Sequence, residues 1–223
     1  MKLAIAMPTM RYMDSKTAIC LAGLCATAAQ DPAVDDLIIK NLSIGYIDLS
    51  RTMLAVEVLN MGADAILWFD HDMIFPADTF SILNTREVAV VGALYRTRTP
   101  PKFDRLDPPP DATRAPHKFS AALSAREWLP NGVMLVRKEV YAAMFKAGQQ
   151  FYRAGWGLDP EQPHAHIGED IDFSRRARAL GFALWADMQL TQEVQHIAEV
   201  PLHWNTFGME QGARPQGVVG AKA

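Results

Sequence analysis

Two aspartates, one residue apart, directly follow an apolar run in the first third of the chain. Asp70 and Asp72 come after residues 66–69, whose unbroken apolar character predicts a buried strand. Charge at the end of such a strand lies at the edge of the sheet, where open α/β folds bind ligands. Adjacent carboxylates repel each other unless a cation neutralises them, and their hard oxygens suit Mg²⁺ or Mn²⁺. The pair therefore indicates a divalent metal site, and the alternative is two solvated residues that open a turn before Pro76.

A second acidic group lies far along the chain. Glu169, Asp170 and Asp172 open a segment that predicts a helix over residues 168–180. Negative side chains in a first turn are favoured by the helix dipole, so a well-capped helix is the simplest interpretation of these residues. His196 stands in an apolar setting, where a lone histidine is more often a core residue than a ligand. By themselves these residues leave structural and catalytic roles open.

The elements that must position these residues alternate through the first hundred positions. Apolar runs bounded by turn residues predict strands, and amphipathic stretches between them predict helices. We expect strands within 3–7, 36–47, 66–69 and 88–95, and helices over 15–29, 51–61 and 76–83. This order is typical of a Rossmann-like half. Beyond it we expect an irregular segment at 99–116, a kinked strand at 128–136, a helix at 138–147, a mobile loop at 155–166 and a strand at 182–185.

Composition limits the class of protein. A chain of 223 residues can bury a sizeable core as one domain, and a net charge of −3 gives no global attraction to nucleic acid or anionic membranes. Cys20 and Cys25 have neither zinc-site nor disulfide-framework spacing, so we expect buried reduced thiols. The amino-terminal apolar run is too short for a signal peptide, and no apolar stretch is long enough for a membrane span. We expect a cytoplasmic protein.

Taken in order, these segments resemble the GT-A glycosyltransferases, particularly the compact family 2-like enzymes of bacteria and phages. The resemblance covers roughly residues 1–204 and is carried by Pro8–Thr9, Arg51, 62–76, 91–96, 131–137, 168–177 and 195–197. It implies one α/β domain of the GT-A fold, which is Rossmann-like with a mixed central sheet flanked by helices. Within it, 1–98 would be the nucleotide-sugar-binding half and 117–204 the acceptor and catalytic half. Residues 205–223 would form a flexible tail.

The resemblance also implies roles for single residues. Asp70 would contact the donor ribose or the metal with its bound water, Asp72 would bind Mn²⁺ or Mg²⁺ directly, and His196 would complete the coordination. Asp170 would be the general base on the acceptor hydroxyl, with Glu169 as its substitute if the register differs. Pro8, Thr9 and Arg51 would hold the nucleotide, and Asn131 and Gly132 would lie where donor sugar and acceptor meet.

The implied function is metal-dependent transfer of a sugar from a nucleoside-diphosphate sugar to an acceptor hydroxyl, with inversion. The alternatives are a nucleotidyltransferase of similar fold and a non-catalytic protein that binds sugar nucleotides or glycans. The second strand, which ends near residues 41–43, has no evident acidic residue there to read the base, so the donor is left as a UDP- or GDP-sugar. The acceptor is left open among a glycan, a lipid-linked sugar, a protein, a small molecule and modified DNA. DNA stays in that set because Arg96, Arg98, Lys102 and Arg105 make one loop basic.

Overall fold

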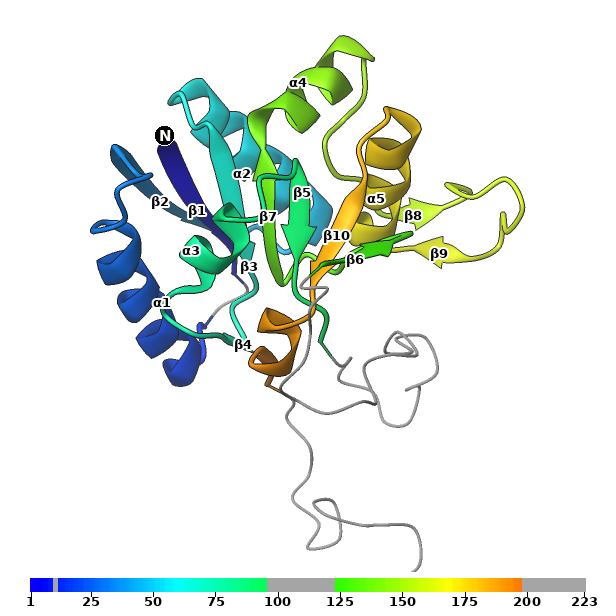
Figure 1. The fold of residues 1–223 in the computed structure, drawn as a ribbon. Coiled ribbons are helices and arrows are strands. Elements are labelled where there is room, and N and C mark those ends of the chain that lie inside the picture. The colour runs from blue at the N-terminus through cyan, green and yellow to red at the C-terminus, as the bar shows by residue number, and fades with distance from the viewer. Residues whose placement is uncertain (10–11, 96–122, 198–223) are drawn as a thin grey trace, which may run out of the picture.

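The computed structural model describes residues 1–9, 12–95 and 123–197 (Figure 1). The predicted irregular segment at 99–116 and the predicted tail at 205–223 lie outside the described residues, as do the basic residues Arg96, Arg98, Lys102 and Arg105. Within the described part, no helix has the length and apolar character needed to cross a membrane. Cys20 and Cys25 are free thiols, as expected, but both are only partly buried.

A seven-stranded mixed sheet forms the centre of the molecule. The chain runs in one direction in five of its strands and in the other direction in β7 and β6, as the strand pairings require. The carboxyl ends of β3 and β5 therefore meet the amino end of β7 at a single edge. In spatial order the strands are β2 (Asp36–Leu42), β1 (Lys2–Pro8), β3 (Ala65–Phe69), β7 (Val133–Arg137), β5 (Val90–Gly92), β10 (Leu184–Asp187) and β6 (Leu123–Arg126).

Helices cover both faces of this sheet because successive strand side chains point to opposite sides. In β3, Ile66 and Trp68 pack in the cluster that includes α2, α4 and α5, whereas Leu67 and Phe69 pack in the cluster that includes α1 and α3. Each face thus has its own apolar core. The helices are α1 (Ser15–Ala28), α2 (Ile47–Asn60), α3 (Thr79–Asn84), α4 (Lys138–Lys146) and α5 (Glu169–Ala179).

Two short pairings lie outside the main sheet. β4 (Met73–Ile74) pairs antiparallel with β11 (Gln195–His196), which brings the end of the described chain beside the end of β3. β8 (Gly155–Trp156) pairs with β9 (His166–Ile167) in a hairpin beside α5 (Figure 1). The predicted loop at 155–166 is therefore bounded by paired strands. A short 3-10 helix, η3 (Leu190–Gln192), precedes β11.

Helix α2 begins earlier than the sequence suggests. We expected a helix over 51–61, but the helix starts at Ile47, so Asp48 and Ser50 lie inside it. The reason is tertiary, because the Asp48 carboxylate accepts a hydrogen bond from the Ala154 amide at 3.2 Å and Ser50 is buried. Arg51 consequently projects from within the helix towards the sheet edge.

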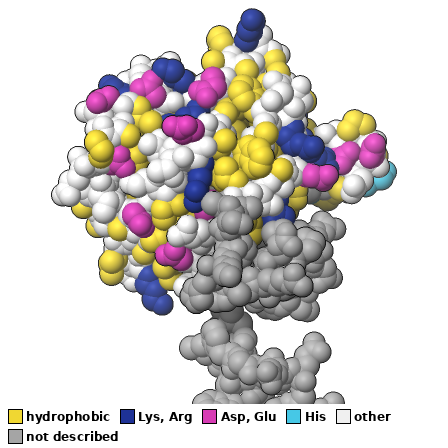
Figure 2. All heavy atoms as spheres, in the orientation of Figure 1, with side chains coloured by type: hydrophobic (Ala, Val, Ile, Leu, Met, Phe, Trp, Pro, Cys, Tyr) yellow, Lys and Arg dark blue, Asp and Glu magenta, His cyan; other side chains and the backbone are white. Residues whose placement is uncertain are grey.

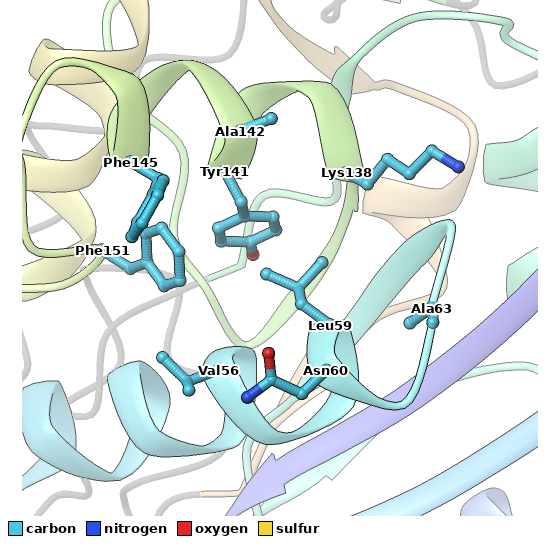
Figure 3. A pocket seen from close by; sticks show the side chains of 10 residues that line it. Val56, Leu59, Asn60, Ala63, Lys138, Tyr141, Ala142, Phe145 and Phe151 are labelled. Atoms are coloured by element: carbon cyan, nitrogen blue, oxygen red, sulfur yellow. The ribbon is translucent and has the colours of Figure 1, made fainter.

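An apolar pocket of about 420 Å³ lies between α2 and α4 (Figure 3). Val56, Leu59, Tyr141, Phe145 and Phe151 contribute to its lining. Gly62 and Ala63, which lead into β3, close one side, so the pocket lies at the amino end of that strand. It is therefore at the opposite end of the strand from Asp70 and Asp72.

Candidate active site

The sheet topology gathers the predicted site residues at one edge. Asp70 follows β3 directly, and its amide donates a hydrogen bond to the carbonyl of Gly132 at 3.2 Å. Asn131 and Gly132 precede β7, which runs antiparallel to β3. Pro8 ends β1, the parallel neighbour of β3, and the Thr9 amide donates to the Leu42 carbonyl at 2.9 Å. The predicted site residues at the ends of β1 and β3 and those before β7 thus lie at the same edge.

Arg51 is a buried cation that joins two of the predicted carboxylates. Its Nη2 lies 2.5 Å from Oδ1 of Asp70, and its Nε lies 3.2 Å from Oε1 of Glu169. The guanidinium also lies 5.4 Å from the ring centroid of Trp68, and only 1% of the side chain is exposed. Burial alone would lower the pKa of Arg51, but the charges of Asp70 and Glu169 raise it above its ordinary value. Arg51 therefore fixes Asp70 and Glu169, which lie far apart in the sequence, relative to each other.

Asp170 differs from its neighbour Glu169 in having no salt bridge within the described part of the chain. Its Oδ1 accepts a hydrogen bond from the Ile171 amide at 2.8 Å. Burial, with the negative charges of Glu169 and Asp70, raises the pKa of Asp170 from 3.8 to about 7, against the opposing effects of the Ile171 amide and Arg51. A carboxyl with such a pKa exchanges a proton near neutral pH. That property suits a general base.

Asp72 and His196 meet although they lie far apart in the sequence. Nε2 of His196 lies 3.4 Å from Oδ2 of Asp72, and both side chains are largely buried. The β4–β11 pairing sets this contact, and the Ile197 amide donates to the Asp72 carbonyl at 2.8 Å. A carboxylate oxygen with an imidazole nitrogen is a suitable partial ligand set for Mn²⁺. Among the described residues, no group of three or more His, Cys, Asp or Glu side chains could hold a metal.

Tyr95 joins these two parts of the site, and the sequence analysis assigned it no role. Its hydroxyl accepts a hydrogen bond from the Gly132 amide at 2.8 Å, and its ring stands edge-on to His196 at 5.3 Å. A Cβ at position 132 would lie 2.3 Å from that hydroxyl, so this contact requires glycine. Burial raises the pKa of Tyr95 well above its usual value, and the Asp70 charge adds to the effect. The sequence signal was its place at the end of the expected strand 88–95, within the block 91–96 that carries the resemblance.

Asn131 presents a buried amide at the centre of this edge. The residue is 2% exposed, and neither its side-chain nitrogen nor its oxygen has a hydrogen-bond partner among the residues that the structure describes. Buried polar groups are normally satisfied by protein, water or ligand. Together with Tyr95 and Asp70, Asn131 defines the place where a polar ligand would be bound.

The fold of this chain is similar to the folds of known protein structures. No protein-family model and no curated protein sequence matches the chain. The crystal structure of A197 from STIV is similar with a TM-score of 0.53 and 13% identity, over 89% of this chain and 87% of that one. S. aureus TarS 1-349 is similar with a TM-score of 0.47 and 12% identity, over 88% of this chain and 60% of that one.

A third solved structure is described as a glycosyltransferase involved in the glycosylation of the major capsid of PBCV-1. Its TM-score is 0.33 with 11% identity, over 84% of this chain and 94% of that one. Of these three, only A197 is similar enough to support an argument about architecture. As the sequence predicted, the chain is a single α/β unit with a mixed seven-stranded sheet flanked by helices, and it shares this fold with A197. This is the architecture that the resemblance to the GT-A glycosyltransferases implies.

Proposed function

We propose that this chain is a metal-dependent glycosyltransferase that moves a sugar from a nucleoside-diphosphate sugar to an acceptor hydroxyl with inversion. One observation carries the proposal. At one edge of a GT-A-type sheet, Asp72 and His196 lie 3.4 Å apart, and the Arg51 network holds Asp70 and Glu169 at the same edge. Asp170, the residue after Glu169, is close enough to Asp70 for that charge to shift its pKa. A metal-binding pair, a carboxylate for the donor and a general base are the groups that this transfer needs.

Asp72 and His196 would hold the metal, and Asp70 would complete the donor site. When bound, Mn²⁺ or Mg²⁺ would offset the negative charge that develops on the departing diphosphate. Arg51 keeps Asp70 in one orientation, since it binds Oδ1 of that carboxylate from a buried position. A UDP- or GDP-sugar would therefore meet a preorganised carboxylate. Pro8 and Thr9 would line the nucleotide side of the site.

Asp170 would be the general base. It would accept the proton of the acceptor hydroxyl while that oxygen attacks the anomeric carbon on the side opposite the diphosphate, and this single displacement inverts the centre. Glu169 is the less suitable candidate because its carboxylate is already bound to Arg51. We therefore assign Glu169 to positioning and Asp170 to proton transfer.

Asn131 and Tyr95 would orient the donor sugar. The amide of Asn131 offers both a donor and an acceptor to sugar hydroxyls. The Tyr95 hydroxyl binds the Gly132 amide, which fixes the turn that carries Asn131. Loss of either group should therefore weaken the alignment of the reacting carbon.

A thermal-shift panel of UDP- and GDP-sugars, each with and without Mn²⁺, tests this function. One donor at about one hundred times its Kd should stabilise the protein by about 2.7 kcal/mol, and the shift should require Mn²⁺. Asp72→Asn should abolish the Mn²⁺-dependent part of the thermal shift. Asp35→Asn is the control and should leave the shift unchanged, because Asp35 is 83% exposed and remote from the site.

The proposal fails if no nucleotide sugar stabilises the protein, or if Asp72→Asn leaves the Mn²⁺-dependent shift intact. Release of pyrophosphate from a nucleoside triphosphate would instead identify a nucleotidyltransferase. Donor binding without turnover by any acceptor would identify a binding protein.

A further inference from the structure

Trp156 is a large aromatic side chain that stands exposed beside the helix carrying Asp170. It ends β8 and is 70% exposed, although tryptophan is usually well buried. Gly157 follows it with a φ of 71°, a left-handed backbone conformation that favours glycine. We infer that Trp156 is the platform on which a sugar ring of a glycan acceptor stacks, an inference that rests on the proposed function for the role of Asp170.

The hairpin that carries Trp156 is firmly attached. Trp156 is paired in register with His166, and their rings meet edge to face at 5.5 Å. Within the hairpin loop, Oδ2 of Asp159 lies 2.8 Å from Nη1 of Arg175 on α5. Before the hairpin, Arg153 binds both carboxylate oxygens of Asp172, also on α5. The indole is thus held in a defined position relative to the helix.

The hairpin leads directly into the catalytic end of α5. β9 ends at Ile167 and α5 begins at Glu169, so His166, the pairing partner of Trp156, is four residues from Asp170. That length of extended chain spans at most roughly 14 Å. The hairpin and the helix also lie side by side in Figure 1. A short oligosaccharide stacked on Trp156 could therefore place a hydroxyl at Asp170.

The charge of the hairpin favours a neutral glycan over a nucleic acid. Residues 154–168 contain no Lys or Arg, and Glu161 is exposed on the loop. Figure 2 shows acidic and histidine side chains at the outer end of this projection. A polyanion requires basic side chains for its phosphates. A pyranose has C–H bonds on its faces and hydroxyls at its rim, so an exposed indole beside polar groups matches it.

Phe145 offers a matched control for an exposed aromatic residue. It is 77% exposed on α4 and lines the apolar pocket (Figure 3), which lies at the opposite end of β3 from Asp70 and Asp72. Truncation of either side chain removes an exposed ring without opening the core. Only the truncation of Trp156 should weaken the binding of an acceptor.

The test is a binding panel of cello-, malto- and chito-hexaoses and a single-stranded DNA hexamer, measured by titration calorimetry and saturation-transfer NMR. At least one oligosaccharide should bind the wild type and Phe145→Ala equally. Trp156→Ala should weaken that binding about ten- to one-hundred-fold, the scale of one stacking contact, and Trp156→Phe should restore part of it. Hydrolysis of the nucleotide sugar by water should be unchanged in Trp156→Ala.

The outcomes separate this inference from the proposed function. If the donor is hydrolysed but no oligosaccharide binds, or if Trp156→Ala binds as the wild type does, the inference is wrong and the transferase proposal stands. Binding of DNA alone would also overturn it. If an oligosaccharide binds through Trp156 but no nucleotide sugar is turned over, the platform stands and the catalytic proposal fails.

Discussion

Two carboxylates in the first turn of α5 have opposite environments. Asp172 is buried, accepts two hydrogen bonds from Arg153, and lies 2.7 Å from Nε of Arg176. Arg176 in turn donates to the carbonyls of Gln150 and Phe151. Asp170 has the Ile171 amide as its hydrogen-bond donor and a pKa raised to about 7 by burial and neighbouring negative charge. The same residue type is therefore a structural anion on one side of the helix and a titratable acid on the other, because the surroundings differ.

The comparison is tested most strongly by Asp170→Asn. The amide keeps the size of the side chain but cannot accept the acceptor proton, so kcat should fall by about 10²- to 10⁴-fold. The donor-induced shift in Tm should persist, since the donor site is intact. Turnover assays and thermal shifts on the same preparations measure both effects. Glu169→Gln is the matched control and should lose less activity, and equal losses in the two variants would argue against Asp170 as the base.

Asp172→Asn should lower the free energy of unfolding, because Asp172 has a structural role and does not take part in sugar transfer. The change leaves Arg176 buried beside a neutral group, and breaking a buried ion pair in this way costs about 3–5 kcal/mol of unfolding free energy. Urea denaturation measures the difference. Asp159→Asn removes a pair whose Arg175 is 47% exposed, so it should cost no more than about 1 kcal/mol. Similar losses in both variants would contradict the structural role of Asp172.

The raised pKa of Asp170 predicts a pH dependence of stability. The folded state binds the Asp170 proton more tightly than the unfolded chain does. This binding therefore stabilises the fold fully below pH 3.8, and the stabilisation is lost as the pH rises through about 7. Asp170→Asn cannot ionise, and its Tm relative to the wild type should therefore increase from about pH 5 to about pH 8. Thermal scans without divalent metal measure this difference. A constant difference across the range would show that the pKa of Asp170 is not raised.

The smallest expected effect is that of Tyr95→Phe. The ring against His196 remains, but the Gly132 amide loses its acceptor, at a cost of about 1–3 kcal/mol of unfolding free energy. KM for the donor should rise more than kcat falls, because the turn that carries Asn131 loosens. Tyr46→Phe, at a tyrosine that is 71% exposed, is the control. Unchanged stability and KM would remove Tyr95 from the site.

Much of the architecture followed from local patterns. Apolar runs located β1, β2, β3 and β10 to within a few residues, and the acidic turn after Gly168 located α5, because burial and helix capping act on neighbouring residues. The two-residue strands β4, β8, β9 and β11 were not predicted, since their pairing partners lie elsewhere in the chain. The predicted start of α2 was wrong for a related reason, because Asp48 accepts a hydrogen bond from the distant Ala154 amide.

For the site, the sequence determined which ionisable groups are present and which strand ends and helix starts carry them. Asp70 and Asp72 were identified as candidates from type and position, because a charge that ends an apolar strand must face the edge of a sheet. Asp170 and His196 became candidates only through the resemblance to the GT-A glycosyltransferases. Only the tertiary structure decided their partners. Arg51 joins Asp70 to Glu169 and Tyr95 approaches His196 through contacts between elements distant in sequence, and burial, which no local pattern reports, sets the pKa of Asp170.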